Sequence, residues 1–190
     1  MKYYKLIYDF ENDDDYDYAM LKSDDITDFY DNRISKGEYI DCWDNDIKLK
    51  YNEDDGNILS DFLAIDNGWI IVSKKFCNVM HEILNENIQC LGIKIINETT
   101  NEENNTYKIL NVTKHLDALD LDNSVYDIFQ FCEDRVLSIE KYALKKTIIE
   151  SNNIFKLDNE TIPVFVSEKF KQVVEENNLI GFQFIEVKTV

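Results

Sequence analysis

Two histidines and four cysteines are the residues of this sequence most able to bind a metal or act as nucleophile and base. His81 follows Cys77 by four residues, a spacing that places both on one helix face as possible metal ligands. No second Cys/His pair has zinc-ligand spacing, and His115 lies among aspartates, where a hydrogen-bonded loop histidine is expected. We therefore expect no metal and no cofactor.

The sequence also gives no clear match to other catalytic or ligand-binding motifs. A Ser–His–Asp site would have to use Ser73 or Ser167, but each precedes a helical apolar pattern and is better explained as a helix N-cap. The run Asp9–Asp17 lacks the glycine and final glutamate that an EF-hand loop needs at its sixth and twelfth positions. Phosphate-binding glycine motifs are absent from the sequence. The sequence thus predicts a binding protein and not an enzyme, with a carboxylate-dependent hydrolase as the open alternative, because no single acid stands out among 38.

The charge is large and uneven. The chain has 20 Lys and Arg against 38 Asp and Glu, a net charge of −18, and residues 1–66 alone hold 19 acids and 7 bases. A field of this sign repels nucleic acid and anionic membranes and attracts basic proteins. We expect a basic protein partner, with neither nucleic acid nor membrane, while acidity for solubility alone remains the simpler alternative.

The expected location is the cytoplasm. The cysteines, at positions 42, 77, 90 and 132, show no C-x-x-C spacing, which predicts buried or half-buried thiols in a reducing compartment. The first residues lack the apolar segment of a signal peptide, and no apolar run reaches the roughly 20 residues of a membrane helix.

The elements that would position any site repeat themselves. The pentad V-S-x-K-F occurs at Val72–Phe76 and again at Val166–Phe170, each time after a short apolar strand and before an apolar helix face. A further strand follows each helix. The sequence therefore predicts an α+β fold with mixed sheets and two strand–helix–strand units, at about 68–97 and 162–188. We expect an acidic region, 1–66, packed on an α+β core, 67–190, as one compact unit.

Smaller elements fill the remainder. The patterns predict strands at 2–8, 47–51, 106–112, 135–144 and 153–157, with a turn at 53–57. Residues 115–129 look like a loop with one helical turn at most.

The segment 9–55 is the predicted interface. It holds 17 acids and 5 bases with aromatics between them, so its carboxylates would complement a basic partner and its aromatics would anchor the contact. For Trp43 a place in the core is an equally good interpretation. The predicted partner-binding residues are Asp13, Asp14, Asp15, Tyr16, Asp17, Asp24, Asp25, Asp28, Asp31, Trp43, Asp54 and Asp55.

Two blocks of the chain carry a family resemblance. The first comprises Asn111, Val112, Leu119, Asp120 and Ser124, and the second comprises Ile154, Phe155, Val166, Ser167, Glu168, Gly181 and Phe184. Over about residues 40–187 the sequence resembles a family of small bacterial proteins, first described as a domain of unknown function. That family was later assigned as the eleventh immunity class of polymorphic toxin systems.

The resemblance implies a protein that binds and neutralises a cognate toxin, often encoded by the neighbouring gene. It does not reach the acidic segment 9–31, so the interface there rests on charge alone. A stand-alone acidic interaction module is the other alternative, and the sequence indicates no oligomeric state.

Overall fold

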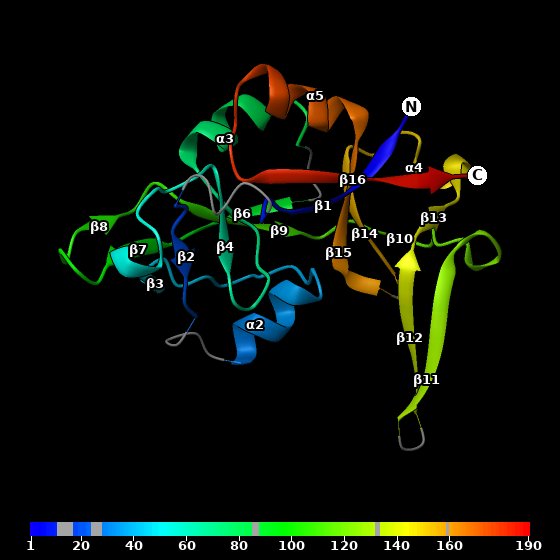
Figure 1. The fold of residues 1–190 in the computed structure, drawn as a ribbon, viewed down its shortest axis with the longest axis horizontal. Coiled ribbons are helices and arrows are strands. Elements are labelled where there is room, and N and C mark those ends of the chain that lie inside the picture. Colours follow the sequence, from blue (N-terminus) through cyan, green and yellow to red (C-terminus); the bar gives the residue numbers. More distant parts are fainter. Residues whose placement is uncertain (11–16, 24–27, 85–87, 132–133, 159) are drawn as a thin grey trace.

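The computed structural model describes residues 1–190 except 11–16, 24–27, 85–87, 132–133 and 159. It shows an α+β fold in which helices pack on mixed sheets, as predicted (Figure 1). The helices are α2 (Asp28–Ser35), α3 (Lys74–Met80), α4 (Lys146–Ile149) and α5 (Glu168–Glu176), with 3₁₀ turns η1 (Glu53–Asp55) and η2 (Leu121–Asn123). None of the helices formed by the described residues has the length and apolar character of a membrane-spanning helix.

Two large sheets form the body of the molecule. The first has the order β10 (His115–Leu116), β14 (Ile154–Leu157), β15 (Glu160–Ser167), β1 (Tyr3–Tyr8), β16 (Phe182–Thr189) and β13 (Ala143–Leu144). The second has the order β2 (Met20–Leu21), β4 (Phe62–Ile65), β5 (Ile71–Val72), β9 (Lys108–Val112) and β6 (Ile88–Gly92). A three-stranded sheet of β3 (Lys48–Tyr51), β7 (Lys94–Asn97) and β8 (Glu103–Asn104) adjoins them, and β11 (Val125–Phe131) pairs only with β12 (Asp134–Lys141).

Both predicted helix caps are present. The Oγ of Ser73 accepts a hydrogen bond from the amide of Phe76 at 3.1 Å, and the Oγ of Ser167 accepts one from the amide of Phe170 at 3.2 Å. Each cap hydroxyl also donates to the residue that precedes the neighbouring strand: Ser73 to Asp61 Oδ1 at 2.5 Å, and Ser167 to Asn153 Oδ1 at 2.9 Å. The two caps are thus the same structural device used twice.

The repetition extends over most of both sheets. The strands β2–β4–β5–β9–β6 and β10–β14–β15–β1–β16 follow one order, with the same parallel and antiparallel pairings. Val72 and Gly92 both pair with Lys108, and their counterparts Val166 and Glu186 both pair with Tyr4. One inner strand of each sheet, β1 in the first and β9 in the second, comes from the opposite half of the chain to the other strands. The two halves are therefore interlocked by a reciprocal exchange of strands.

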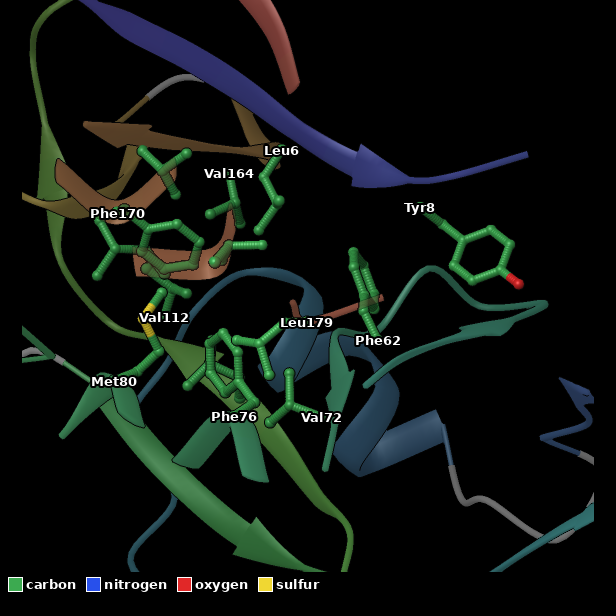
Figure 2. Close-up of a cluster of buried hydrophobic side chains, with 14 of the residues drawn as sticks. Leu6, Tyr8, Phe62, Val72, Phe76, Met80, Val112, Val164, Phe170 and Leu179 are labelled. Atoms are coloured by element: carbon green, nitrogen blue, oxygen red, sulfur yellow. The ribbon is translucent and has the colours of Figure 1, made fainter. Parts of the chain in front are cut away.

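The two helices meet over a shared core. The ring centroids of Phe76 on α3 and Phe170 on α5 lie 6.0 Å apart, and Met80, Leu6 and Val112 pack around them (Figure 2). The opposite face of each large sheet packs against a separate hydrophobic cluster. In the second sheet this cluster includes Leu63 and Ile71, and in the first it includes Phe155 and Phe165. Alternation of side chains along the strands makes this possible, since successive residues point to opposite faces.

Several predicted elements differ from the observed ones. The single strand expected after the first helix is two strands, β6 and β7, which belong to different sheets on either side of the buried Ile93. Residues 115–129, expected as a loop with one helical turn at most, contain such a turn, η2, but also β10 and most of β11. These two strands are completed by β14 and β12, which lie outside that stretch of sequence. The strand expected at 135–144 is likewise two strands, β12 and β13, in different sheets. The turn expected at 53–57 contains the 3₁₀ turn η1, and the strands expected at 2–8, 47–51, 106–112 and 153–157 are present within a few residues.

The division into an acidic region and a core at residue 66 stays a prediction. What the structure shows is that β1, β2 and β4 from the first 66 residues pair within both large sheets.

Candidate functional site

Three of the predicted interface acids share one corner of the molecule. Asp17 has a positive φ of 54°, and its Oδ2 accepts from the side-chain amide of Asn57 at 2.6 Å. Asn57 follows η1, which carries Asp54 and Asp55, both exposed. Asp55 forms an ion pair of 2.9 Å with Lys22. Asp17 thus lies beside Asp54 and Asp55 at one turn, although these acids are distant from it in the sequence.

Trp43 lies in a different place and is half-buried. Its Nε1 donates a hydrogen bond to the carbonyl oxygen of Gly92 at 2.7 Å. The ring centroids of Trp43 and Tyr30 lie 4.9 Å apart in an edge-to-face arrangement, and Trp43 packs against the hydrophobic cluster of the second sheet. These contacts give it a structural role, and any part in partner binding stays a prediction. Asp31, beside Tyr30 on α2, is half-buried, and its Oδ1 has no hydrogen-bond partner among the described residues.

The remaining predicted interface residues cannot be placed as a surface. Six of them, Asp13, Asp14, Asp15, Tyr16, Asp24 and Asp25, lie outside the described residues, and Asp28 is described only as the first residue of α2.

Ion pairs use much of the positive charge in this region. Lys22, Arg33 and Lys48 each contact a carboxylate, within 3.5 Å, and Lys94 pairs with Asp46 at 2.6 Å. The hydrogen bond from Lys94 lowers the pKa of Asp46. Asp41, Asp44 and Asp54 are exposed and take part in none of the ion pairs that the described residues form. Their charge is available to a partner.

The hairpin β11–β12 is a second exposed feature, and sequence reasoning missed it. It projects from the body of the molecule, away from α3 and α5 (Figure 1). Ile128 and Phe129 are each 56% exposed on opposite faces of the ribbon, and Val125 and Tyr126 are exposed near its base. A two-stranded ribbon is marginally stable by itself in water. Exposed apolar side chains on both faces are typical of an interaction surface.

The groups considered for catalysis do not converge. His81 follows the last residue of α3, with Nδ1 2.8 Å from the carbonyl oxygen of Asn78, and His115 contacts the carbonyl oxygens of Thr113 and Lys36 through its two ring nitrogens. No group of three potential metal ligands occurs among the described residues. Ser73 and Ser167 have their hydroxyls engaged as caps.

Two of the thiols form a pair. The Cys77 thiol on α3 hydrogen-bonds the Cys90 sulfur on β6, which lowers the pKa of Cys90 to about 7. The same hydrogen bond, together with burial, raises the pKa of Cys77. The expectation of buried or half-buried thiols is correct for Cys77 and wrong for Cys42 and Cys90, which are exposed, while Cys132 lies outside the described residues.

The cavities give the hydrolase alternative no particular support. Glu140 and Glu186 line one cavity of about 400 Å³ together with Lys5, Lys141 and Lys188, and Glu186 is ion-paired with Lys2 at 2.7 Å. Two further cavities lie beside β4, the loop 67–70 and β15, and the described residues that line them include no carboxylate.

Comparison with known proteins gives one match. A family model described as "Immunity protein family (Imm11)" matches residues 2–189. The match reaches beyond the 40–187 over which the sequence motifs were recognised, and it includes the acidic segment. No curated protein matches the chain.

Proposed function

Since this chain belongs to the Imm11 immunity protein family, we propose that it binds its cognate toxin directly and neutralises it through the acidic surface of residues 9–55. The observation that carries the proposal is the concentration of charge, 17 acids against 5 bases, in a segment where the bases are largely engaged in ion pairs. The toxin would be basic and would act in the cytoplasm, where this chain meets it. A nuclease fits that description best.

The mechanism needs no chemistry from this chain. Carboxylates at the η1 corner and around Asp41 and Asp44 attract the basic surface of the toxin and orient it, which raises the association rate. Burial of the toxin's substrate cleft under the bound chain then excludes its substrate. Affinity comes from the apolar contacts that the acidic rim surrounds.

The hairpin β11–β12 supplies such apolar contacts in this proposal. Ile128 and Phe129 are largely in water, and no strand formed by the described residues pairs with either side of the ribbon. An arm of this shape would insert into a groove of the toxin and bury both faces at once. Each side chain buried in this way would contribute about 1.5–3 kcal/mol.

A binding experiment with matched charge changes tests the acidic surface. The variant Asp41→Asn, Asp44→Asn and Asp54→Asn removes three exposed charges of the segment. The control variant Asp122→Asn, Asp158→Asn and Glu176→Gln removes three exposed charges elsewhere. The toxin is the product of the neighbouring gene, and its association rate is measured at several salt concentrations.

We expect the first variant to associate roughly three- to tenfold more slowly at low salt and to show a flatter salt dependence. The control should keep the wild-type rate and salt slope. Equal effects of the two variants would mean that only the total charge matters, and the local surface would be refuted.

The hairpin is tested by Ile128→Ser with Phe129→Ser. Because both side chains are exposed, the free chain should keep its melting temperature, while the toxin dissociates at least about tenfold faster. An unchanged dissociation rate would remove the hairpin from the interface.

A further inference from the structure

A cavity of about 150 Å³ lies where the end of α2 meets the loop 67–70 and the strands β9, β14 and β15. Among the residues whose side chains the structure describes, no carboxylate lines it, although 38 of the 190 residues are acidic. Its polar side chains include Lys156, Asn67 and Trp69, and its walls are apolar, with Ile70 and Leu110 among them.

Lys156 brings a buried positive charge to this cavity. The side chain is on β14, only 6% exposed, and forms no ion pair among the described residues. Its Nζ donates to the carbonyl oxygen of Ser35 at 2.7 Å and reaches that of Ile34 at 3.4 Å. These carbonyls end α2, where the helix offers no internal donors and carries a partial negative charge. An ammonium group has three N–H donors, so one remains for a ligand.

Two more donors of the lining residues have no acceptor. Trp69 is 3% exposed, and its Nε1 has no hydrogen-bond partner among the described residues. The Nδ2 of Asn67 is likewise buried and without a partner. The orientation of the Asn67 amide follows from its Oδ1, which accepts from the backbone amide of Trp69 at 3.2 Å. A buried donor without a partner costs about 1–3 kcal/mol, so a ligand that accepts from both would relieve that cost.

The space beyond this cavity is mostly apolar, although Lys5 is among the residues that line it. A second cavity of about 310 Å³ shares Trp69, Ile70 and Val164 with the first and continues along Leu6 and Phe62. A ligand whose head lies near Lys156 thus has room for a hydrocarbon body.

We propose that these joined cavities bind a small carboxylate with an apolar body, whose oxygens accept from Lys156 Nζ, Trp69 Nε1 and Asn67 Nδ2. One negative charge matches the buried ammonium group of Lys156, whereas a phosphate dianion would leave a second charge uncompensated beside it. Asp31 also carries an unpartnered buried oxygen on α2, but it is not among the residues that line the cavity.

Isothermal titration calorimetry on the full chain tests the site with four probes: sodium hexanoate, 1-hexanol, hexylammonium chloride and inorganic phosphate. We expect hexanoate to bind with one-to-one stoichiometry and at least about tenfold more tightly than hexanol, because a charge-assisted hydrogen bond contributes about 1.5–3 kcal/mol. Hexylammonium and phosphate should show no saturable binding.

Variants assign the effect to named groups. Lys156→Met should weaken hexanoate at least about tenfold and leave hexanol unchanged, since only the charged contact is lost. Lys36→Met, which removes one charge from an exposed residue just after α2, should bind like the wild type. If Lys156→Met does not fold, Trp69→Phe carries the same test by removing one donor.

Three outcomes would overturn the proposal. Equal affinities for hexanoate and hexanol would mean an apolar cavity without a carboxylate site. Tighter binding of phosphate would assign the donors to another anion. Hexanoate affinity unchanged in Lys156→Met and in Trp69→Phe would place its binding elsewhere.

Discussion

The buried amine of Lys156 makes a quantitative prediction about stability and pH. Burial lowers the pKa of Lys156 from 10.5 to about 8. The unfolded chain keeps this proton up to about pH 10.5, whereas the folded chain releases it near pH 8. Between these values the unfolded state binds more protons, so the free energy of unfolding rises with pH. Below pH 8 the full cost of burying the charged amine, about 3 kcal/mol, is present.

The variant Lys156→Met lacks the titrating amine, so its difference from the wild type gives the pH dependence of the unfolding free energy that Lys156 causes. We expect the wild type to gain about 2–3 kcal/mol of unfolding free energy relative to Lys156→Met between pH 7 and pH 10. The quantity to compare is the difference in unfolding free energy between the two proteins, because the net charge of −18 and the other titrating groups affect both in the same way. Bound ligand must be absent, since a carboxylate beside the amine would raise its pKa again.

Urea unfolding followed by circular dichroism at four pH values measures the difference. Lys36→Met is the control for a lost surface charge, and its difference from the wild type should stay flat over this range. A flat difference for Lys156→Met would refute the reasoning, since it would mean that the folded and unfolded chains hold this proton equally.

Three further predictions concern the repeated architecture. Ser73→Ala should lower the free energy of unfolding, measured with urea, by about 2–3 kcal/mol, and Ser167→Ala by about 1 kcal/mol. The first substitution costs more because it also removes a hydrogen-bond donor from the buried carboxylate of Asp61. Equal losses would contradict this. Gly181→Ala should lower the melting temperature far more than Gly68→Ala. Both have positive φ, but a Cβ at the first would lie 2.3 Å from a backbone oxygen and one at the second would meet nothing within 4 Å; similar shifts would show that only backbone strain matters. A chain cut in the turn 98–102 should give halves that fold only when mixed, since each lacks one inner strand of its large sheet; a cooperative transition in either half alone would argue against the exchange.

The repeated units could be predicted from the sequence because their signals are local. A serine before an apolar helical face fixes the cap, and the apolar spacing from Phe76 and from Phe170 fixes which side of each helix is buried. The way in which the two units share strands could not be predicted, because β1 near one end of the chain pairs with β15 and β16 near the other. Nothing within β1 itself distinguishes it from β9 as a partner.

The hairpin and the donor cavity were missed for different reasons. Ile128 and Phe129 are adjacent and both exposed, so β11 lacks the polar alternation that marks a half-buried strand. Lys156 gave a signal that was available: a single lysine inside the apolar strand Ile154–Leu157, where a charge is costly. The acidic segment was evident from composition, but composition could not show that Asp17 joins the η1 turn or that Trp43 is tied to Gly92.

Growth rescue by co-expression tests the central claim most directly. The product of the neighbouring gene is expressed in a laboratory bacterium with the wild-type chain, with the variant that removes Asp41, Asp44 and Asp54, or without either. The account predicts growth arrest that the wild-type chain relieves, with the two proteins purifying as one complex, and weaker relief by the variant. Arrest that this chain does not relieve, or relief without a complex, would contradict neutralisation by direct binding.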